Sequence, residues 1–287
     1  MSGAVQPSGG GPKLVDPSTR SNPLEIVVTH FDLHLAVDFD AKVLRGDIEL
    51  TAAAATNDEG KKDLPSKLVL DVNHLKISKI FHLPNATSSA SDDDAEVGPK
   101  QLPFTVADGG AVGNSLTIPL SAKHFDDAAV VRLRIAYATT PESSAVQWLD
   151  REATKDKKAP FLFTQCQAIH ARTLLPCQDT PMVKATYSAT VRCPAGTTAI
   201  MSALGNGDAP QEEHEDGSRT FAFRQPIAMA SYLVALAVGN LASKEVGPRS
   251  SVWAEPSVVD AAAYEFADTE KFIATGEKIC GPYQWTR

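Results

Sequence analysis

The stretch EIVVTHFDLHLAVDFD, residues 25–40, alternates apolar and polar side chains. That period of two predicts a half-buried β-strand, because successive side chains of a strand point to opposite faces of its sheet. The predicted inward face consists of Val27, Phe31, Leu33, Leu35, Val37 and Phe39, and the outward face of His30, Asp32, His34, Asp38 and Asp40.

Further runs with strand character follow along the chain, separated by clusters of turn-forming residues. Together with the first run they predict an antiparallel, mostly β domain over residues 25–240. The predicted runs are 43–54, 67–72, 75–82, 115–120, 130–139, 161–165, 184–193, 198–203, 220–225 and 230–238.

The two ends of the chain differ from this pattern. Residues 1–24 are rich in Gly, Pro and Ser and offer little apolar surface, so we expect a disordered tail. Near the other end, apolar residues recur at helical spacing and predict one helix from about Ser257 to Ile279, capped by Ser257. Its expected apolar face is Val259, Ala262, Phe266 and Ile273. Residues 241–287 therefore read as the incomplete beginning of a mixed α/β domain.

Composition and charge exclude several function classes. The 27 Lys and Arg against 35 Asp and Glu give a formal charge of 27 − 35 = −8, which argues against nucleic acid and anionic membranes as partners. The longest apolar run, 227–238, is shorter than the roughly 20 residues of a membrane span. Four cysteines in a chain of 287 residues form no disulfide framework, so we expect a reducing, cytoplasmic location.

Neither metal-ligating nor nucleophilic motifs are found. No HExxH or GxSxG pattern is present. His30 and His34 share one strand face about 13 Å apart, too far to hold one ion. The acidic run at 88–96 contains consecutive rather than alternating aspartates and reads as a surface loop, not a calcium site. We therefore predict no metal ligand and no catalytic residue in this chain.

One stretch, FLFTQCQAIHARTLLPCQDTPMVK at residues 161–184, is dense in special residues. Gln165 and Gln167 are two apart, so in a strand their amides would face one way and could bind a peptide. The alternative is that both amides satisfy nearby loop carbonyls. Pro176 and Pro181 stiffen the following connection, as suits the rim of a site. Asp179 reads either as a turn-capping or as a catalytic carboxylate.

A resemblance to a known protein family rests on four short stretches: QCQAIH (165–170), LLPCQDTP (174–181), SSAVQWL (143–149) and CGPYQW (280–285). They are similar to the amino-terminal region of M1-family zinc aminopeptidases, in the branch of leukotriene A4 hydrolase and aminopeptidase B. The resemblance implies a saddle-like β domain followed by a thermolysin-like catalytic domain, of which residues 241–287 would be the beginning. It places the zinc ligands beyond Arg287, so this segment alone is expected to be inactive and to bind no zinc.

The resemblance also implies a substrate site at Gln165, Cys166 and Gln167, where Gln167 accepts a hydrogen bond from the free amine of a peptide. Many broader relatives have Glu at the positions of Gln167 and Thr180, which leaves an uncharged anchor here. The expected partners are peptide substrates and the remainder of the catalytic domain, and a second activity, hydrolysis of a leukotriene A4-type epoxide, stays open. The alternative is a non-catalytic β-rich interaction module that retains the family scaffold.

Overall fold

The structure is a computed structural model that describes residues 16–56, 63–84, 98–205 and 209–285. Residues 1–15, most of the predicted tail, lie outside the described residues, and so does the predicted acidic loop at 88–96.

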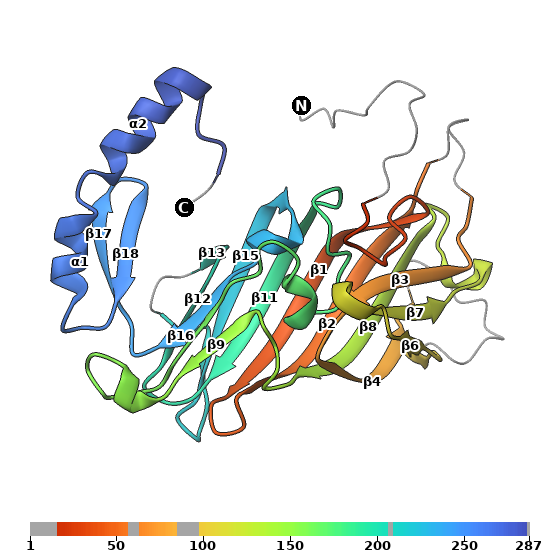
Figure 1. Cartoon of the computed structure of the whole chain (residues 1–287), viewed down its shortest axis with the longest axis horizontal. Helices are drawn as coiled ribbons and strands as arrows, with labels where there is room; N and C mark the ends of the chain where they lie inside the picture. Colours follow the sequence, from red (N-terminus) through yellow and green to blue (C-terminus); the bar gives the residue numbers. More distant parts are fainter. Residues whose placement is uncertain (1–15, 57–62, 85–97, 206–208, 286–287) are drawn as a thin grey trace.

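The described part of the chain is built on one long, twisted sheet (Figure 1). Eight strands follow one another across it, and a ninth, β14, pairs with β15. In spatial order the strands are β13 (Leu204–Gly205), β15 (Arg219–Met229), β11 (Ala185–Cys193), β1 (Ile26–Asp38), β2 (Val43–Ala54), β8 (Val130–Thr139), β4 (Leu75–His82) and β5 (Lys100–Gln101), with β14 at Glu212–Glu213.

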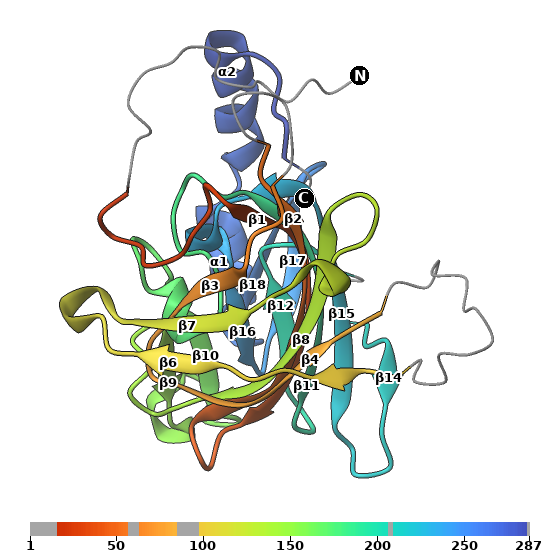
Figure 2. The same cartoon turned by 90° about the vertical axis from the view of Figure 1, so that its right-hand side faces the viewer.

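Two smaller sheets lie on the same side of the long sheet (Figures 1 and 2). One has the order β12 (Thr198–Met201), β16 (Leu236–Gly239), β10 (Phe161–Thr164) and β9 (Val146–Leu149). The other has the order β3 (Lys67–Val72), β7 (Asn114–Pro119) and β6 (Thr105–Ala107). One hydrophobic core joins all three sheets, because its buried members include Leu33 of the long sheet, Leu70 of the three-stranded sheet and Leu162 of the four-stranded sheet.

These elements confirm the predicted mostly β fold class. The strand predicted at 43–54 has the bounds of β2, and those predicted at 67–72, 75–82 and 130–139 have the bounds of β3, β4 and β8. The long sheet departs from a purely antiparallel arrangement at one place, because β1 and β11 run parallel, with His30 opposite Thr186. About 150 residues separate these partners in sequence, so the connection has ample length to cross over.

A β-bulge changes which residues of β1 face the core. The register with β2 shifts between Val28 and His30, so Ile26 and Val28 are buried while Val27 is only half-buried. The prediction for Val27 was wrong because an extra residue in one strand reverses the alternation before it. Gln178 completes the bulge: its Oε1 accepts from Val28 N at 2.9 Å, and its Nε2 donates to Ile26 O at 2.8 Å.

The structure also differs from the prediction of one strand over residues 230–238. Only Leu236–Gly239 forms β16, because Ser231–Leu233 forms a short 3-10 helix. Its backbone bonds run from Leu233 N to Ala230 O and from Val234 N to Ser231 O. Apolarity alone does not separate a 3-10 turn from a buried strand, and no residue of this turn is buried. The other 3-10 helices are Gly110–Val112, Ala122–His124, Arg151–Ala153 and Ala171–Thr173.

The segment after Gly239 forms a separate unit at one end of the long sheet (Figure 1). A hairpin of β17 (Ala242–Gly247) and β18 (Ser250–Ala254) packs against α1 (Val259–Glu265) and α2 (Thr269–Cys280). Glu255 ties this unit to the β domain, since its carboxylate accepts from the backbone N–H groups of Lys155 and Asp156 at 2.8 and 2.9 Å. No helix within the described ranges has the length and apolarity needed to cross a bilayer.

The prediction of one helix from Ser257 to Ile279 was wrong, because the chain forms two helices. Between them, Thr269 donates to Phe266 O from both its backbone N at 3.1 Å and its Oγ1 at 2.7 Å. Asp and Thr side chains compete with helical hydrogen bonds and favour helix starts, which explains the break. Ser257 does not cap α1, whose N-cap is Val258, and Phe266 is exposed.

Residues 16–22, which belong to the predicted disordered tail, lie against the β domain. Arg20 N and Thr19 Oγ1 both donate to the carboxylate of Asp71, the first at 2.6 Å. Asn22 Oδ1 accepts from Val69 N at 2.8 Å. The fully buried Asp71 carboxylate needs donors, and this segment supplies two of them.

Candidate functional site

The predicted substrate residues lie on a turn that follows β10. The strand ends at Thr164, and residues 167–170 form a turn that is closed by a hydrogen bond from His170 N to Cys166 O at 2.9 Å. The prediction that the β run extends through Gln167 was therefore wrong, and strand geometry does not set the direction of the two glutamine side chains. Both glutamines are nevertheless exposed.

A hydrogen bond links Gln165 and Gln167. The side-chain Oε1 of Gln165 accepts a hydrogen bond from the backbone N–H of Gln167 at 3.0 Å. The backbone of Gln165 is itself held, since its N–H donates to Ala145 O at 2.8 Å. Within the described structure, the side-chain amide of Gln167 makes no hydrogen bond and lies on the surface.

Cys166, between the two glutamines, points into the core. Its exposed fraction is 1%. Burial raises the pKa of its thiol to about 12, so the thiolate form is disfavoured at neutral pH. Of the three predicted site residues, the structure brings two side chains to the surface and uses the third as an anchor beneath them.

A set of hydrogen bonds that sequence reasoning missed braces the far end of the turn. Ser144 Oγ lies 2.6 Å from His170 Nδ1. Thr173 Oγ1 donates to His170 O at 2.8 Å and accepts from Ala145 N at 3.0 Å. Ser144 and Ala145 belong to the upstream word SSAVQWL, but nothing in that word signals which residues it contacts.

The segment that continues from the turn is part of the core and not a rim. Residues 171–180 are all buried, so the site-rim interpretation of Pro176 and its neighbours was wrong. Arg172 Nε lies 2.9 Å from Asp179 Oδ2, and both side chains are almost fully buried. Asp179 Oδ1 accepts from Ser231 Oγ at 2.7 Å. These contacts favour the structural interpretation of Asp179 over a catalytic one.

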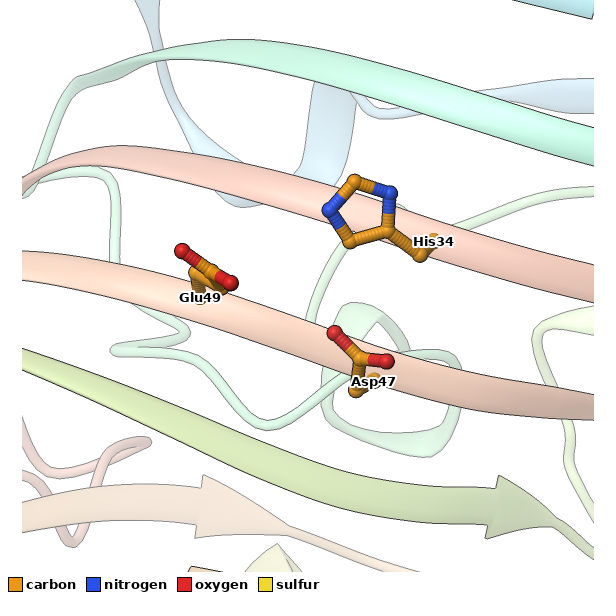
Figure 3. Close-up of side chains that lie close together, drawn as sticks. All are labelled: His34, Asp47 and Glu49. Carbon is orange, nitrogen blue, oxygen red and sulfur yellow. The ribbon is translucent and has the colours of Figure 1, made fainter. Parts of the chain in front are cut away.

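A candidate metal-binding cluster lies elsewhere, on the long sheet (Figure 3). His34 of β1 faces Asp47 and Glu49 of β2, and one ligand atom from each lies within 4.8 Å of the others. This is the one such group of three or more found in the described ranges. His34 Nδ1 is bonded to Thr190 Oγ1 at 2.9 Å, which leaves Nε2 on the side of the carboxylates.

The charges around this cluster do not favour a zinc ion. Arg134 donates to Glu49 Oε1 through Nε at 2.8 Å and through a second, shorter bond, and Arg132 Nη2 lies 3.4 Å from Glu49 Oε2. Arg134 Nε is also 3.9 Å from Asp47. Two guanidinium groups already balance two carboxylates, so a dication would meet like charge at close range. The cluster fits a cross-strand charge ladder rather than a zinc centre.

A cleft of about 690 Å³ separates the β domain from the C-terminal unit. Its lining is mostly apolar and includes Met201, Leu204, Phe223, Trp253 and Phe266. Arg249 also lines it, but its guanidinium group is paired with Glu270 and Glu277. The residues of the glutamine turn do not line this cleft.

Comparison with known proteins supports the resemblance seen in the sequence. The family model for the Peptidase M1 N-terminal domain matches residues 27–233, well over half of the chain. The chain belongs to the M1 peptidase family. That match covers the long sheet, the glutamine turn and the buried segment that follows it.

Individual M1 relatives agree with this assignment. Leukotriene A-4 hydrolase from Xenopus laevis is 35% identical over 273 residues, covering 95% of this chain and 41% of the relative. Leucine aminopeptidase 2 from Chaetomium globosum is 37% identical over 271 residues, covering 94% of this chain and 40% of the relative. The chain thus spans about two fifths of the length of these relatives.

Solved M1 structures share the fold. The Saccharomyces cerevisiae leukotriene A4 hydrolase in complex with bestatin superposes with a TM-score of 0.78 at 30% identity, covering 97% of this chain and 39% of that one. An M1 zinc metallopeptidase from Deinococcus radiodurans superposes with a TM-score of 0.66 at 22% identity, covering 91% and 55%. The second likeness shows the fold alone.

Proposed function

We propose that this chain is the substrate-cleft-contributing amino-terminal region of a zinc-dependent aminopeptidase that removes amino-terminal residues from peptides. The observation that carries the proposal is the placement of Gln167: its side chain is exposed on a turn whose neighbours are anchored in the core. Membership of the M1 family supplies the context for that turn. The substrate class comes from relatives named as aminopeptidases.

The proposed chemistry of Gln167 is recognition of a charged amine by a neutral acceptor. Its carbonyl oxygen can accept a hydrogen bond from the ammonium group of a peptide's first residue. An anchor at that group fixes the distance from the chain end to the bond that is cut, so only the first residue is removed. Gln167 neither donates nor removes a proton in the reaction, because a neutral amide has no suitable pKa.

Zinc is proposed for the longer protein and not for this segment. The family resemblance supports a metal site downstream, where zinc would activate the water that attacks the peptide bond. Within the described residues, the His34, Asp47 and Glu49 cluster does not fit that ion, because two arginines hold Glu49 and Arg134 Nε lies 3.9 Å from Asp47. This chain therefore contributes binding and orientation only.

We further propose that residues 25–240 form the β domain and that residues 241–287 begin the zinc domain. Tyr264, Phe272 and Ile279 of α1 and α2 have exposed fractions of 84%, 72% and 78%. Large apolar side chains this exposed support the proposal that further chain covers these helices. A reducing, cytoplasmic location is proposed as well, since all four cysteines are free.

Metal analysis beside an activity assay tests the proposal. We expect the isolated 287-residue chain to bind no stoichiometric zinc and to cleave no aminoacyl reporter, and we expect a version extended downstream to do both. An extended protein with neither property would instead favour a non-catalytic interaction module. A leukotriene A4-type epoxide assayed on the same extended protein tests the second activity.

The role of Gln167 has its own test in the extended enzyme. We expect Gln167→Ala to raise KM for peptides by an amount equivalent to about 1.5 to 3 kcal/mol, the value of a hydrogen bond to a charged group. The exposed Gln101 of β5 offers a matched control, and Gln101→Ala should leave KM unchanged. An unchanged KM in Gln167→Ala would reject the assigned role.

A further inference from the structure

One hydrogen bond links the two glutamines of the turn. The backbone N of Gln167 donates to the side-chain Oε1 of Gln165, and the two atoms are 3.0 Å apart. A backbone N–H is a donor, so the group of Gln165 that meets it is the amide oxygen and not the NH2 group. The side chain of Gln167 takes no part in this bond.

This bond connects a fixed point to the proposed anchor. The backbone of Gln165 is tied to Ala145, a fully buried residue, through its own N–H at 2.8 Å. The side chain of Gln165 then spans from that fixed backbone to the N–H of Gln167. The far end of the turn is held separately by Ser144 and Thr173, through their contacts with His170. The backbone that carries the Gln167 side chain is therefore held from both sides.

We propose that Gln165 is a positioning residue for Gln167 rather than a second contact to the substrate amine. The inference rests on the proposed function of Gln167 and divides the pair into one anchor and one support. The amide oxygen of Gln165 orients the backbone at Gln167 and thereby fixes where the Gln167 oxygen meets the ammonium group. Pre-organisation of this kind improves binding because less ordering is left to the moment of association.

A double-mutant cycle in the complete extended enzyme shows whether Gln165 positions Gln167 or binds the substrate amine itself. Gln→Met keeps the length of the side chain and removes its acceptor. We expect Gln167→Met to raise KM at least about tenfold and Gln165→Met to raise it about threefold to tenfold, with kcat within about twofold in both. In the Gln167→Met background, adding Gln165→Met should change KM no further, because the supported group is gone. Gln101→Met is the control and should match the parent enzyme.

The outcomes distinguish the two ideas. Multiplicative effects of the two substitutions would show an independent substrate contact and overturn the positioning role, while leaving Gln167 as the anchor. No effect of Gln167→Met would reject the proposed function itself.

Amide hydrogen exchange in the present chain then tests the support directly. Gln165→Met should accelerate exchange of the Gln167 N–H by about tenfold, since its acceptor is lost. Unchanged exchange at that amide would overturn the inference, whatever the kinetics show.

Discussion

Arg172 and Asp179 form an ion pair inside the β domain, with 2.9 Å between Nε and Oδ2 and exposed fractions of 2% and 1%. A second carboxylate, that of Asp71, lies 3.9 Å from the same guanidinium group and is fully buried. Asp71 also accepts from Asp179 N at 2.9 Å. One cation thus joins two acids from distant parts of the chain, and the segment after the glutamine turn depends on this network.

Removal of the cation should destabilise the domain strongly. Arg172→Met leaves Asp71 and Asp179 buried without their counter-ion, and breaking one side of a buried pair costs about 3 to 5 kcal/mol. We expect urea denaturation, followed by circular dichroism, to show a loss of this size in the free energy of unfolding.

The exposed pair between Arg192 and Asp216, 2.8 Å apart, serves as a control. Arg192→Met should change stability far less, because water solvates the carboxylate that is left. Equal losses in the two variants would contradict the importance of burial at Arg172.

Gln178→Leu should also be costly, for a different reason. The substitution places an apolar side chain in the core and leaves Val28 N–H and Ile26 C=O of the bulge without their partners. Two unsatisfied buried groups, at about 1 to 3 kcal/mol each, cost about 2 to 6 kcal/mol in the free energy of unfolding. Thermal and urea unfolding measure this loss, and the same change at the exposed Gln101 should be nearly neutral. A stable Gln178→Leu variant would show that the bulge tolerates water or another register.

Much of the fold could be predicted from sequence because burial is periodic. Residues 43–54 alternate, one face of β2 packs in the core, and a shift of one residue would expose that whole face. The parallel pairing of β1 with β11 has no such local signal, since it depends on which strands meet after a long connection. The bulge in β1 was missed because its partner, Gln178, lies 150 residues away.

In the candidate site, too, some features could be predicted from the sequence and others could not. The words QCQAIH and LLPCQDTP indicated the family and, through it, Gln167 as the amine anchor, but they did not indicate that residues 167–170 form a turn. The burial of Arg172 could not be predicted, because neither of its sequence neighbours indicates it and its partner Asp71 is 101 residues away. The contacts of Arg172 reach distant parts of the chain, and no local pattern encodes them.

The pH dependence of stability should have opposite signs at two aspartates. Burial raises the pKa of Asp47 above its ordinary value, so the folded state binds that proton more tightly than the unfolded state. Asp47 in its charged form therefore lowers stability, and this loss develops as pH rises from the ordinary aspartate range through the folded pKa. We expect Asp47→Asn to be more stable than the parent chain at pH 7, with the difference shrinking toward pH 4.

Asp16 provides the opposite case. Hydrogen bonds from Ser18 and Thr180 lower the pKa of its carboxyl group. Its charged form adds stability above the ordinary aspartate range, and that stability is lost as pH falls through the folded pKa. Asp16→Asn should therefore be less stable than the parent chain at pH 7, again with a smaller difference near pH 4. Urea unfolding at both pH values measures both variants, and differences of the same sign would contradict this assignment.

Thiol labelling tests whether the glutamine turn stays closed over the core. Cys166, Cys177 and Cys193 are buried, and burial raises the pKa of each thiol, whereas Cys280 is exposed. We expect a disulfide reagent at pH 8 to modify one thiol rapidly in the folded chain and all four in urea, because reaction needs an accessible thiolate. Cys280→Ser should remove the rapid phase. Rapid modification of Cys166 in that variant would mean that the turn opens readily, and a turn that opens could not hold Gln167 in place.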